Sequence, residues 1–300
     1  MENILDLIIV GAGPAGVTAA IYAKRSNINF KIFEKEMVGG NVVNAFEIEN
    51  YPGVGKLMGS DLAIKFIGDL DALGIDVNYE AITKIEKNDD VFKVTTSENE
   101  TYYTKKVLLA LGTKARKLGV SNEDLLLGRG ISYCATCDGS FYKGKDVLVV
   151  GGGNSALTEA LYLSKIVNKI YLITRHELKG DKKEIQKIKE TPNIEVIEFK
   201  TVKEVEGNNF VTGVKIIDTN TNEESSLKVD GIFVYIGQLP PTNIVSDFGV
   251  LNKNGFIEVD EHYETKIKGL FAVGDCINKV VRQIVTATGD AATAIHFIEE

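Results

Sequence analysis

Two cysteines that lie two residues apart, Cys134 and Cys137, are the residues whose types and spacing point most directly to chemistry. An acid, Asp138, follows at once, and a glycine-rich turn at residues 151–153 comes shortly after. Cysteines at this spacing can close a small disulfide, and their thiols can have lowered pKa values. Such a disulfide can accept two electrons and pass them to another disulfide. Taken alone, the pair also fits half of a zinc site or two buried small residues.

Composition and cysteine count narrow the classes of protein to which this pair can belong. The 300 residues carry a net charge of −8, which argues against a basic groove for nucleic acid. The remaining cysteine and the histidines include no second ligand pair at zinc spacing, so a structural zinc site is disfavoured. No apolar run is long enough to span a bilayer, and the first residues lack the features of a signal peptide. We therefore expect a cytoplasmic protein of about two domains, without nucleic-acid or membrane partners, in which the pair is catalytic.

The amino-terminal segment has the pattern of a dinucleotide-binding unit. Residues 7–10 form a continuous apolar run, which is typical of a buried parallel strand. A Gly-x-Gly-x-x-Gly turn at residues 11–16 follows, then a helical pattern, a second strand at residues 30–33, and Glu34. The glycines allow a tight turn and a close approach of the backbone to a pyrophosphate, and Glu34 would hold a ribose hydroxyl. A carboxylate at that place repels a 2′-phosphate, which favours FAD or NAD over NADP.

The middle of the chain repeats this pattern. A buried strand is expected at residues 146–150, followed by a second glycine turn at residues 151–156 with alanine at its third glycine position, and a further strand at residues 170–173. No acid follows that strand. Arg175 and His176 stand where a 2′-phosphate would lie, which favours NADP. A solvated basic face is the alternative reading of these cations.

The carboxyl-terminal segment is too short to form a core of its own. It contains an expected strand at residues 269–275 and a helix of small residues at 286–298. We expect it to complete the first domain, so that residues 1–112 and 243–300 form one domain and residues 113–242 form a second domain inserted in it. The predicted fold class is α/β, with two Rossmann-like, three-layer dinucleotide-binding domains, each carrying a β-meander.

Two neighbouring residues of this segment have different expected roles. Asp275 ends the strand and is placed to accept a hydrogen bond from a cofactor hydroxyl. Cys276 is expected to be a small packing residue rather than a redox partner.

The order of these motifs resembles that of the low-molecular-weight, bacterial-type thioredoxin reductases over nearly the whole chain. The resemblance rests on the motifs at residues 11–16, 39–40, 49–53, 134–139, 151–156, 269–275 and 282–283. The Cys-Ala-Thr-Cys-Asp-Gly run before the second glycine turn is the most specific of them. The resemblance implies FAD in the first domain, NADPH in the inserted domain, a homodimer, and reduction of thioredoxin or a thioredoxin-like protein.

The resemblance also implies roles for single residues. Cys134 and Cys137 would form the active disulfide, with Cys137 facing the flavin and Cys134 attacking the substrate, and Asp138 would be the proton donor. The residues implied at FAD are Gly11, Gly13, Pro14, Ala15, Gly16, Glu34, Gly40, Asn41, Asn50, Gly112, Asp275, Arg282, Gln283 and Ile284. Those implied at the nicotinamide nucleotide are Gly151, Gly153, Asn154, Ser155, Ala156, Arg175 and His176. A cysteine buried against a flavin cannot also meet a protein substrate, so the two domains would rotate about hinges near Lys114 and residues 237–241.

Two departures from the family pattern leave alternatives open. Asn41 stands where the family usually has glutamine. The family run His-Arg-Arg-x-x-x-Arg keeps only one of its three arginines, Arg175, and each lost phosphate contact costs on the order of 1.5–3 kcal/mol. One alternative is therefore the same disulfide chemistry with ferredoxin or NADH as the donor. Another is a non-catalytic, nucleotide-sensing protein, against which the intact Cys-x-x-Cys-Asp run argues.

Overall fold

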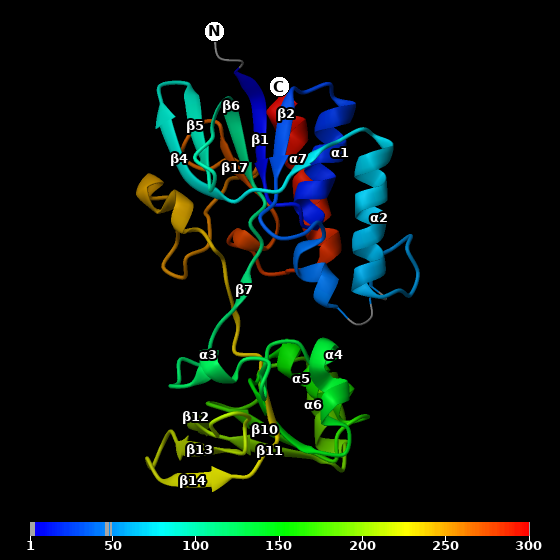
Figure 1. Ribbon diagram of the computed structural model, residues 1–300, viewed down its shortest axis with the longest axis vertical. Coiled ribbons are helices and arrows are strands. Elements are labelled where there is room, and N and C mark those ends of the chain that lie inside the picture. Colours follow the sequence, from blue (N-terminus) through cyan, green and yellow to red (C-terminus); the bar gives the residue numbers. More distant parts are fainter. Residues whose placement is uncertain (1–3, 46–47, 49, 300) are drawn as a thin grey trace. The chain divides into compact units, whose positions relative to one another are not determined.

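The computed structural model describes residues 4–45, 48 and 50–299, and of Asn44, Thr136 and Cys137 it describes the backbone but not the side chain. The chain divides into two compact units (Figure 1). The discontinuous unit comprises Met1–Lys114 and Leu239–Glu300, and the inserted unit comprises Ala115–Gln238. Two short strands stand where the chain passes from one unit to the other, β7 (Lys114–Ala115) and β16 (Gln238–Leu239), and they pair as a two-stranded sheet.

Apolar runs from both ends of the chain form the central parallel sheet of the discontinuous unit. Its parallel strands are β1 (Leu5–Val10), β2 (Phe30–Phe33), β3 (Val77–Asn78), β6 (Thr101–Leu109) and β17 (Leu270–Ala272). β1 lies between β2 and β6, with Val10 opposite both Phe33 and Leu109. β17 pairs with β6, so the carboxyl-terminal segment belongs to the first sheet.

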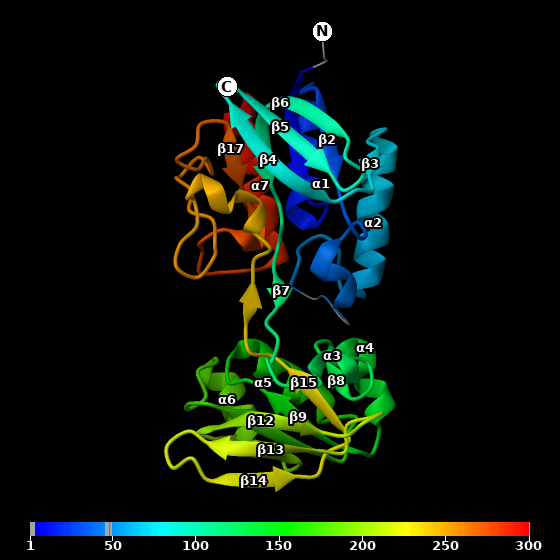
Figure 2. The same cartoon turned by 60° about the vertical axis from the view of Figure 1, so that its left-hand side comes forward.

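Helices cover one face of this sheet, and an antiparallel hairpin extends it. The helices are α1 (Pro14–Arg25), α2 (Gly59–Ala72) and α7 (Ile284–Glu299). α1 and α7 lie side by side, because small residues such as Ala20 and Ala291 are fully buried between them (Figure 1). β4 (Ile82–Asn88) and β5 (Val91–Thr96) continue antiparallel from β6 (Figure 2). Separate apolar clusters lie on the two sides of the sheet, which gives the three layers.

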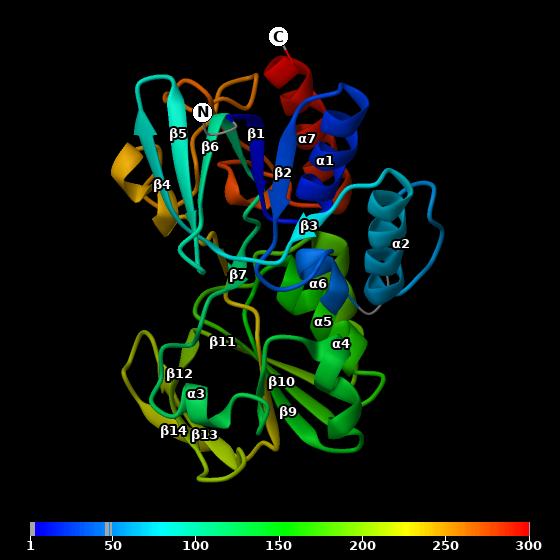
Figure 3. The same ribbon diagram turned by 45° about the horizontal axis from the view of Figure 1, so that its top comes forward.

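The inserted unit repeats this plan with a second parallel sheet (Figure 3). Its strands run in the order β11 (Ile194–Glu198), β10 (Lys169–Thr174), β9 (Asp146–Val150), β15 (Gly231–Val234) and β8 (Ile131–Ser132). One core cluster lies against α5 (Asn154–Leu163) and α6 (Lys182–Glu190). A second cluster lies against an antiparallel sheet of β12 (Lys200–Glu206), β13 (Gly213–Asp218) and β14 (Glu224–Leu227). The short helices are α3 (Glu123–Leu126) and α4 (Ala135–Asp138), with short 3-10 helices at Gly40–Asn44, Gly139–Tyr142, Asn243–Phe248 and Gly274–Cys276.

The predicted fold class is confirmed. In the second meander the apolar pattern indicates a strand at residues 227–229, whereas β14 spans Glu224–Leu227. The Asp218 carboxylate accepts hydrogen bonds from the backbone N–H groups of Asn220 and Thr221, which tightens the preceding turn. Pairing with β13 therefore begins earlier than the apolar pattern suggests. β11 is a strand that the pattern did not indicate at all.

Candidate active site

The first glycine turn leaves room for a ligand beside the backbone at the start of α1. A Cβ on Gly11, whose φ is +103°, would lie 2.4 Å from the Ala110 oxygen, and one on Gly16 would lie 1.8 Å from the Gly11 oxygen. A Cβ on Gly13 would meet only the Gly39 oxygen, at 4.0 Å. The first and third glycines are thus required by the packing of the chain, whereas Gly13 keeps a space clear. No described side chain caps α1, so its first N–H groups are available to an anion such as a pyrophosphate.

Two other loops with predicted FAD residues meet this turn or each other. A Cβ on Gly40 would lie 3.3 Å from the Gly13 Cα, so the second loop lies directly against the turn. The Asn41 side-chain amide donates a hydrogen bond of 2.9 Å to the Thr113 oxygen, beside Gly112. The shorter amide at position 41 therefore has a partner within this unit.

Glu34 is buried at the end of β2, and both of its carboxylate oxygens already accept hydrogen bonds. Oε2 accepts from the Ala12 N–H at 2.7 Å, and Oε1 accepts from the Glu36 N–H at 2.8 Å. These bonds fix the carboxylate beside the glycine turn. Each oxygen can still accept a further hydrogen bond, such as one from a ribose hydroxyl.

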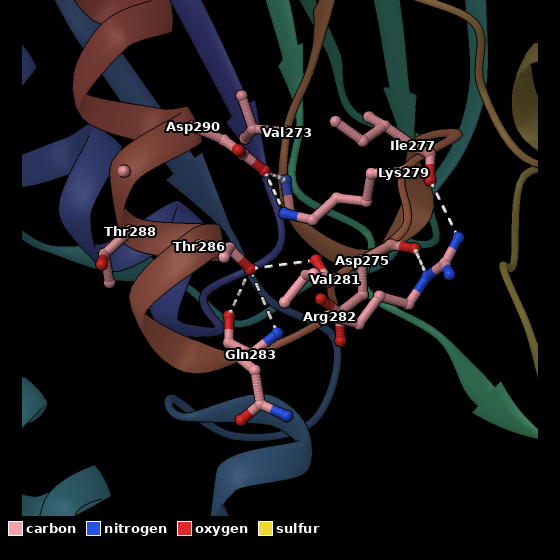
Figure 4. Close-up of polar contacts among 12 residues, drawn as sticks. Val273, Asp275, Ile277, Lys279, Val281, Arg282, Gln283, Thr286, Thr288 and Asp290 are labelled. Carbon is pink, nitrogen blue, oxygen red and sulfur yellow. Dashed lines mark hydrogen bonds and ion pairs between the residues drawn. The ribbon is translucent and has the colours of Figure 1, made fainter. Parts of the chain in front are cut away.

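Asp275 supplies an unsatisfied buried acceptor in the same unit (Figure 4). Its Oδ1 is buried and has no hydrogen-bond partner among the described residues, and burial raises the pKa of its carboxyl. A Cβ on the preceding Gly274 would lie 3.1 Å from the Ala15 Cβ, which places this loop at the start of α1. A buried polar atom without a partner is uncommon in native proteins. The open turn and this orphan acceptor together fit a dinucleotide such as FAD.

Arg282 holds the Asp275 loop with its guanidinium group. Its Nε donates a hydrogen bond to the backbone carbonyl oxygen of Asp275, and one terminal nitrogen donates to the backbone carbonyl oxygen of Ile277 (Figure 4). Both distances are 3.1 Å. The guanidinium carbon also lies 4.2 Å from the centre of the Phe256 ring. The described contacts of Arg282 are therefore with the chain itself, and they shape the loop.

Gln283 and Asn50, which are far apart in sequence, are brought together. The Asn50 side-chain amide donates to the Gln283 side-chain oxygen at 3.0 Å. The Gln283 N–H donates to Thr286 Oγ1 at 3.1 Å, where α7 begins at Ile284 (Figure 4).

Asp290 is a residue of this site that sequence reasoning missed. Its Oδ2 accepts from the Gly274 N–H at 3.0 Å and from Lys279 Nζ at 2.5 Å (Figure 4). Its Oδ1 accepts from the Tyr263 hydroxyl at 3.0 Å. The Lys279 and Asp290 side chains are only 14% and 10% exposed. This buried ion pair ties the Asp275 loop to α7, and the one sequence signal for it was an acid within a helix of small residues.

The second glycine turn has the same construction as the first. Gly151 has φ +146°, and a Cβ there would lie 2.2 Å from the Tyr235 oxygen. Ala156 is fully buried where the third glycine would be, and a Cβ on Gly153 would meet nothing within 4 Å. α5 begins after Gly153 without a described side-chain cap. The turn therefore offers a second open anion site, which fits the pyrophosphate of a nicotinamide nucleotide.

The other predicted residues of the second turn differ in their contacts. Asn154 Oδ1 accepts from the Asp181 N–H at 2.7 Å, so this side chain holds the loop before α6. Ser155 is exposed. Arg175 and His176 are exposed just after β10, and Arg175 Nε donates to Thr201 Oγ1 at 3.4 Å.

The Cys-x-x-Cys turn, residues 134–138, includes α4 (Ala135–Asp138). Side chains from other segments accept hydrogen bonds from its backbone. Cys134 is disulfide-bonded. Its N–H donates to Ser132 Oγ at 3.0 Å, and the Ala135 N–H donates to the Tyr235 hydroxyl oxygen at 2.7 Å. The Asp138 N–H closes the turn onto the Cys134 oxygen at 3.2 Å. The sequence pattern had not indicated the roles of Ser132 and Tyr235.

Of the other two cysteines, the structure describes the side chain of Cys276 only. The Cys137 side chain lies outside the described part of the chain. Cys276 is a free, fully buried cysteine, and burial raises the pKa of its thiol to about 12. A thiol with so high a pKa is unreactive near neutral pH, which agrees with a packing role.

The described residues form neither a metal-binding cluster nor a membrane-spanning helix. They contain no group of three or more side chains arranged to hold a metal ion. No helix among them is long and apolar enough to cross a membrane.

Comparison with known proteins gives the class to which this fold and site belong. The family model described as pyridine nucleotide-disulphide oxidoreductase matches residues 5–291. The thioredoxin reductase of Bacillus subtilis is 40% identical over 305 aligned positions, which cover 100% of this chain and 96% of that protein.

Solved structures agree with this class. A thioredoxin reductase structure from Lactococcus lactis has a TM-score of 0.91 and 37% identity, covering 98% of this chain and 97% of the other. A ferredoxin-flavin thioredoxin reductase from Clostridium acetobutylicum has a TM-score of 0.55 and 31% identity, covering 100% and 98%. The chain belongs to the thioredoxin reductase family of pyridine nucleotide-disulphide oxidoreductases. The predicted family and enzyme class are thus confirmed.

Proposed function

We propose that this chain is a thioredoxin–disulfide reductase that passes electrons from NADPH, through FAD and a disulfide of Cys134 and Cys137, to thioredoxin. The observation that carries the proposal is the disulfide-bonded Cys134 just before α4. Ser132 Oγ accepts the Cys134 N–H, and the Tyr235 hydroxyl oxygen accepts the N–H of the next residue, Ala135. Thioredoxin is the proposed substrate because relatives that match along the whole chain are named thioredoxin reductase.

Cys137 is the proposed partner of Cys134 in this disulfide. The proposal rests on the Cys-x-x-Cys spacing and on the family resemblance. In the proposal Cys134 attacks the substrate disulfide, Cys137 resolves the mixed disulfide, and Asp138 exchanges the proton of the departing thiol. Two S–H bonds of the reductase break and two form on thioredoxin, so electrons and protons balance.

The discontinuous unit is the proposed FAD domain, and the inserted unit is the proposed nicotinamide-nucleotide domain. When bound, these groups supply a hydride donor and a carrier that hands an electron pair to the disulfide. The open turn at Gly13 and the unpartnered Asp275 Oδ1 support FAD in the first unit. We place the hinges of a rotation between the units near Lys114 and residues 237–241, where Gly237 has φ +113°.

NADPH is the proposed donor, with NADH and ferredoxin as the alternatives. The open start of α5 after Gly153 supports a pyridine nucleotide, because a donor protein would not need an anion site there. Arg175 and His176 are exposed cations after β10, suited to a 2′-phosphate.

Anaerobic mixing of the flavoprotein with each donor tests this assignment. NADPH is expected to bleach the flavin faster than NADH at equal concentration. Arg175→Ala should raise the KM for NADPH roughly tenfold or more by removing a charged contact, and should leave the KM for NADH unchanged. Lys187→Ala, which removes a cation from the last turn of α6, is the matched control. Bleaching by reduced ferredoxin and not by NADPH would replace this donor with the alternative.

The proposal also includes a homodimer in the cytoplasm. A redox-active cysteine pair together with a free buried thiol is more typical of a reducing compartment than of a secreted protein. Sedimentation of the flavoprotein tests the dimer, and a monomer at micromolar concentration would remove it from the proposal.

A further inference from the structure

Glu123, the first residue of α3, is a buried acid that the proposed mechanism does not use. Its Oε1 accepts a hydrogen bond from the Leu118 N–H at 2.7 Å, and its Oε2 accepts one from the Gly119 N–H at 2.8 Å. The Tyr133 hydroxyl also donates to Oε1. Buried carboxylates need such donors, because burial of an unpaired charge costs much free energy. Glu123 therefore joins the segment before α3 to Tyr133.

Tyr133 directly precedes Cys134 in the sequence. Its half-buried side chain packs against the apolar cluster that contains Leu126 and Ile131. Burial, and after it the hydrogen bond to Glu123, raises the pKa of the Tyr133 hydroxyl. The hydroxyl therefore keeps the proton that it donates to Glu123 throughout the neutral pH range. This bond fixes the position from which the backbone enters the Cys-x-x-Cys turn.

Tyr235 fixes the same turn from a distant part of the sequence. It directly follows β15, and its hydroxyl oxygen accepts the Ala135 N–H at 2.7 Å. Between the two tyrosine contacts, Ser132 Oγ accepts the Cys134 N–H at 3.0 Å. The residues on both sides of Cys134 are thus each held by a tyrosine.

Both tyrosine contacts lead to the segments that connect the inserted unit to the rest of the chain. Residues 118–119, which Glu123 holds, come shortly after β7, and Tyr235 comes shortly before β16. The Arg116 N–H donates to the Gly237 oxygen at 2.9 Å, so these two segments are also joined to each other. Short chains of hydrogen bonds therefore connect the Cys-x-x-Cys turn with the residues beside both proposed hinges.

These connections matter if the proposed function holds, because the disulfide must then meet the flavin in one arrangement of the units and the substrate in another. Reacting atoms must approach to roughly 3–3.5 Å, and a misplacement of about 1 Å can cost on the order of 100-fold in rate. A turn that moved independently of the hinge segments would lose this precision whenever the unit rotated. A turn that is fixed to them keeps it.

We propose that Glu123, Tyr133 and Tyr235 are positioning residues that make the Cys-x-x-Cys turn move as one rigid piece with the hinge segments. This inference rests on the proposed function. The step that depends on it is the one in which the reduced flavin gives two electrons and two protons to the disulfide, so that the S–S bond breaks and two thiols form. Reduction of the flavin by the donor does not involve the cysteines, so it is independent of these residues.

Anaerobic mixing of the oxidised flavoprotein with one equivalent of NADPH follows both steps in one experiment. Two electron equivalents of another donor replace NADPH if the mixing test described above identifies one. Flavin absorbance falls as the donor reduces the flavin, and it returns as the disulfide takes the electron pair. Tyr133→Phe and Tyr235→Phe should each slow the return by about tenfold, and the rate of the fall should stay within about twofold of the wild-type rate.

Tyr102→Phe is the matched control for Tyr133→Phe. It removes a hydroxyl that also donates to a carboxylate, that of Glu100, in the discontinuous unit. Both rates should remain those of the wild type.

Two further measurements distinguish positioning from a general loss of structure. Glu123→Gln should also slow the return, and the double variant with Tyr133→Phe should be no slower than the slower single variant, because both act through one bond. Deuterium uptake by residues 130–138 of the oxidised flavoprotein, which needs no turnover, should increase in Tyr133→Phe and not in Tyr102→Phe. If Glu123→Gln does not fold, the two tyrosine variants and deuterium uptake decide the question.

The outcomes separate this inference from the proposed function. If the wild-type flavin bleaches and recovers, and Tyr133→Phe recovers at the wild-type rate or is slowed equally in both phases, the positioning role is wrong and the reductase stands. Unchanged deuterium uptake in Tyr133→Phe would also overturn the positioning role. A wild-type flavin that bleaches and never recovers would show that the disulfide takes no electrons, and the proposed function would then fail together with this inference.

Discussion

At the scale of single residues, the glycines of the first turn have different physical roles although they share one motif. A Cβ on Gly16 would collide with the Gly11 oxygen at 1.8 Å, whereas a Cβ on Gly13 has no protein atom closer than 4.0 Å. The space beside Gly13 is therefore kept for something other than the chain. Sequence spacing predicted the motif but could not separate these roles, because both depend on where the backbone returns.

Replacement of Gly13 by valine should separate flavin binding from folding. The side chain would fill the open space, so the variant should purify without the yellow flavin. Its backbone φ of −71° suits any residue, so the melting temperature should stay near that of the wild-type apoprotein. Gly16→Val should instead fail to fold, because its Cβ would lie 1.8 Å from the Gly11 oxygen, a backbone atom that cannot move aside. A yellow Gly13→Val protein would show that the pyrophosphate does not lie there.

Side-chain networks were the part of the site that the sequence could not predict. Asp290 holds Gly274 from α7, and Tyr235 holds Ala135 from the end of β15. Both contacts join segments that are distant in sequence, and neither residue belongs to a local motif. The glycine turns, Glu34 and the cysteine pair were recognisable because the chemistry needs them at fixed spacing.

At the scale of elements, apolar runs predicted the parallel strands well because these strands are buried on both faces. β1, β9 and β10 are nearly continuous in apolar residues and lie inside their sheets. β11 and β14 are edge strands of their sheets with many half-buried or exposed residues, so their sequences lack that signal. Their positions are decided by pairing with a neighbour.

The raised pKa of Glu159, on α5, predicts that the free energy of unfolding depends on pH. The Glu159 carboxyl has an ordinary pKa of 4.5 and a raised one, about 7, in the folded chain. Its contribution to stability is therefore full below pH 4.5 and is lost as pH rises to about 7. Glu159→Gln should lack this loss, so its free energy of unfolding relative to that of the wild type should increase by on the order of 3 kcal/mol across that interval. Chemical denaturation at several pH values measures it, and a constant difference would contradict the assigned burial.

At the scale of the whole molecule, each unit has its own core. The two apolar clusters of the inserted unit contain only residues between 118 and 236, and those of the discontinuous unit contain none of these. The chain ends of the inserted unit are close together, since the Arg116 N–H donates to the Gly237 oxygen at 2.9 Å. An insertion of this kind suits a domain that can fold alone.

Residues 115–238 expressed as a separate chain should fold cooperatively. The expected result is a sigmoidal thermal transition and dispersed amide signals in an NMR spectrum, with no flavin bound. A fragment with neither property would show that the inserted unit depends on the rest of the chain. The same fragment should still bind NADPH if the second glycine turn is the nucleotide site.

The most direct measurement of the central claim compares two cysteine variants in the reduction of thioredoxin. Cys134→Ser should keep its flavin and the bleaching of that flavin by the donor, yet reduce no thioredoxin, because the attacking sulfur is gone. Cys276→Ala should reduce thioredoxin at the wild-type rate, because its buried thiol takes no part. Undiminished thioredoxin reduction by Cys134→Ser would contradict the account.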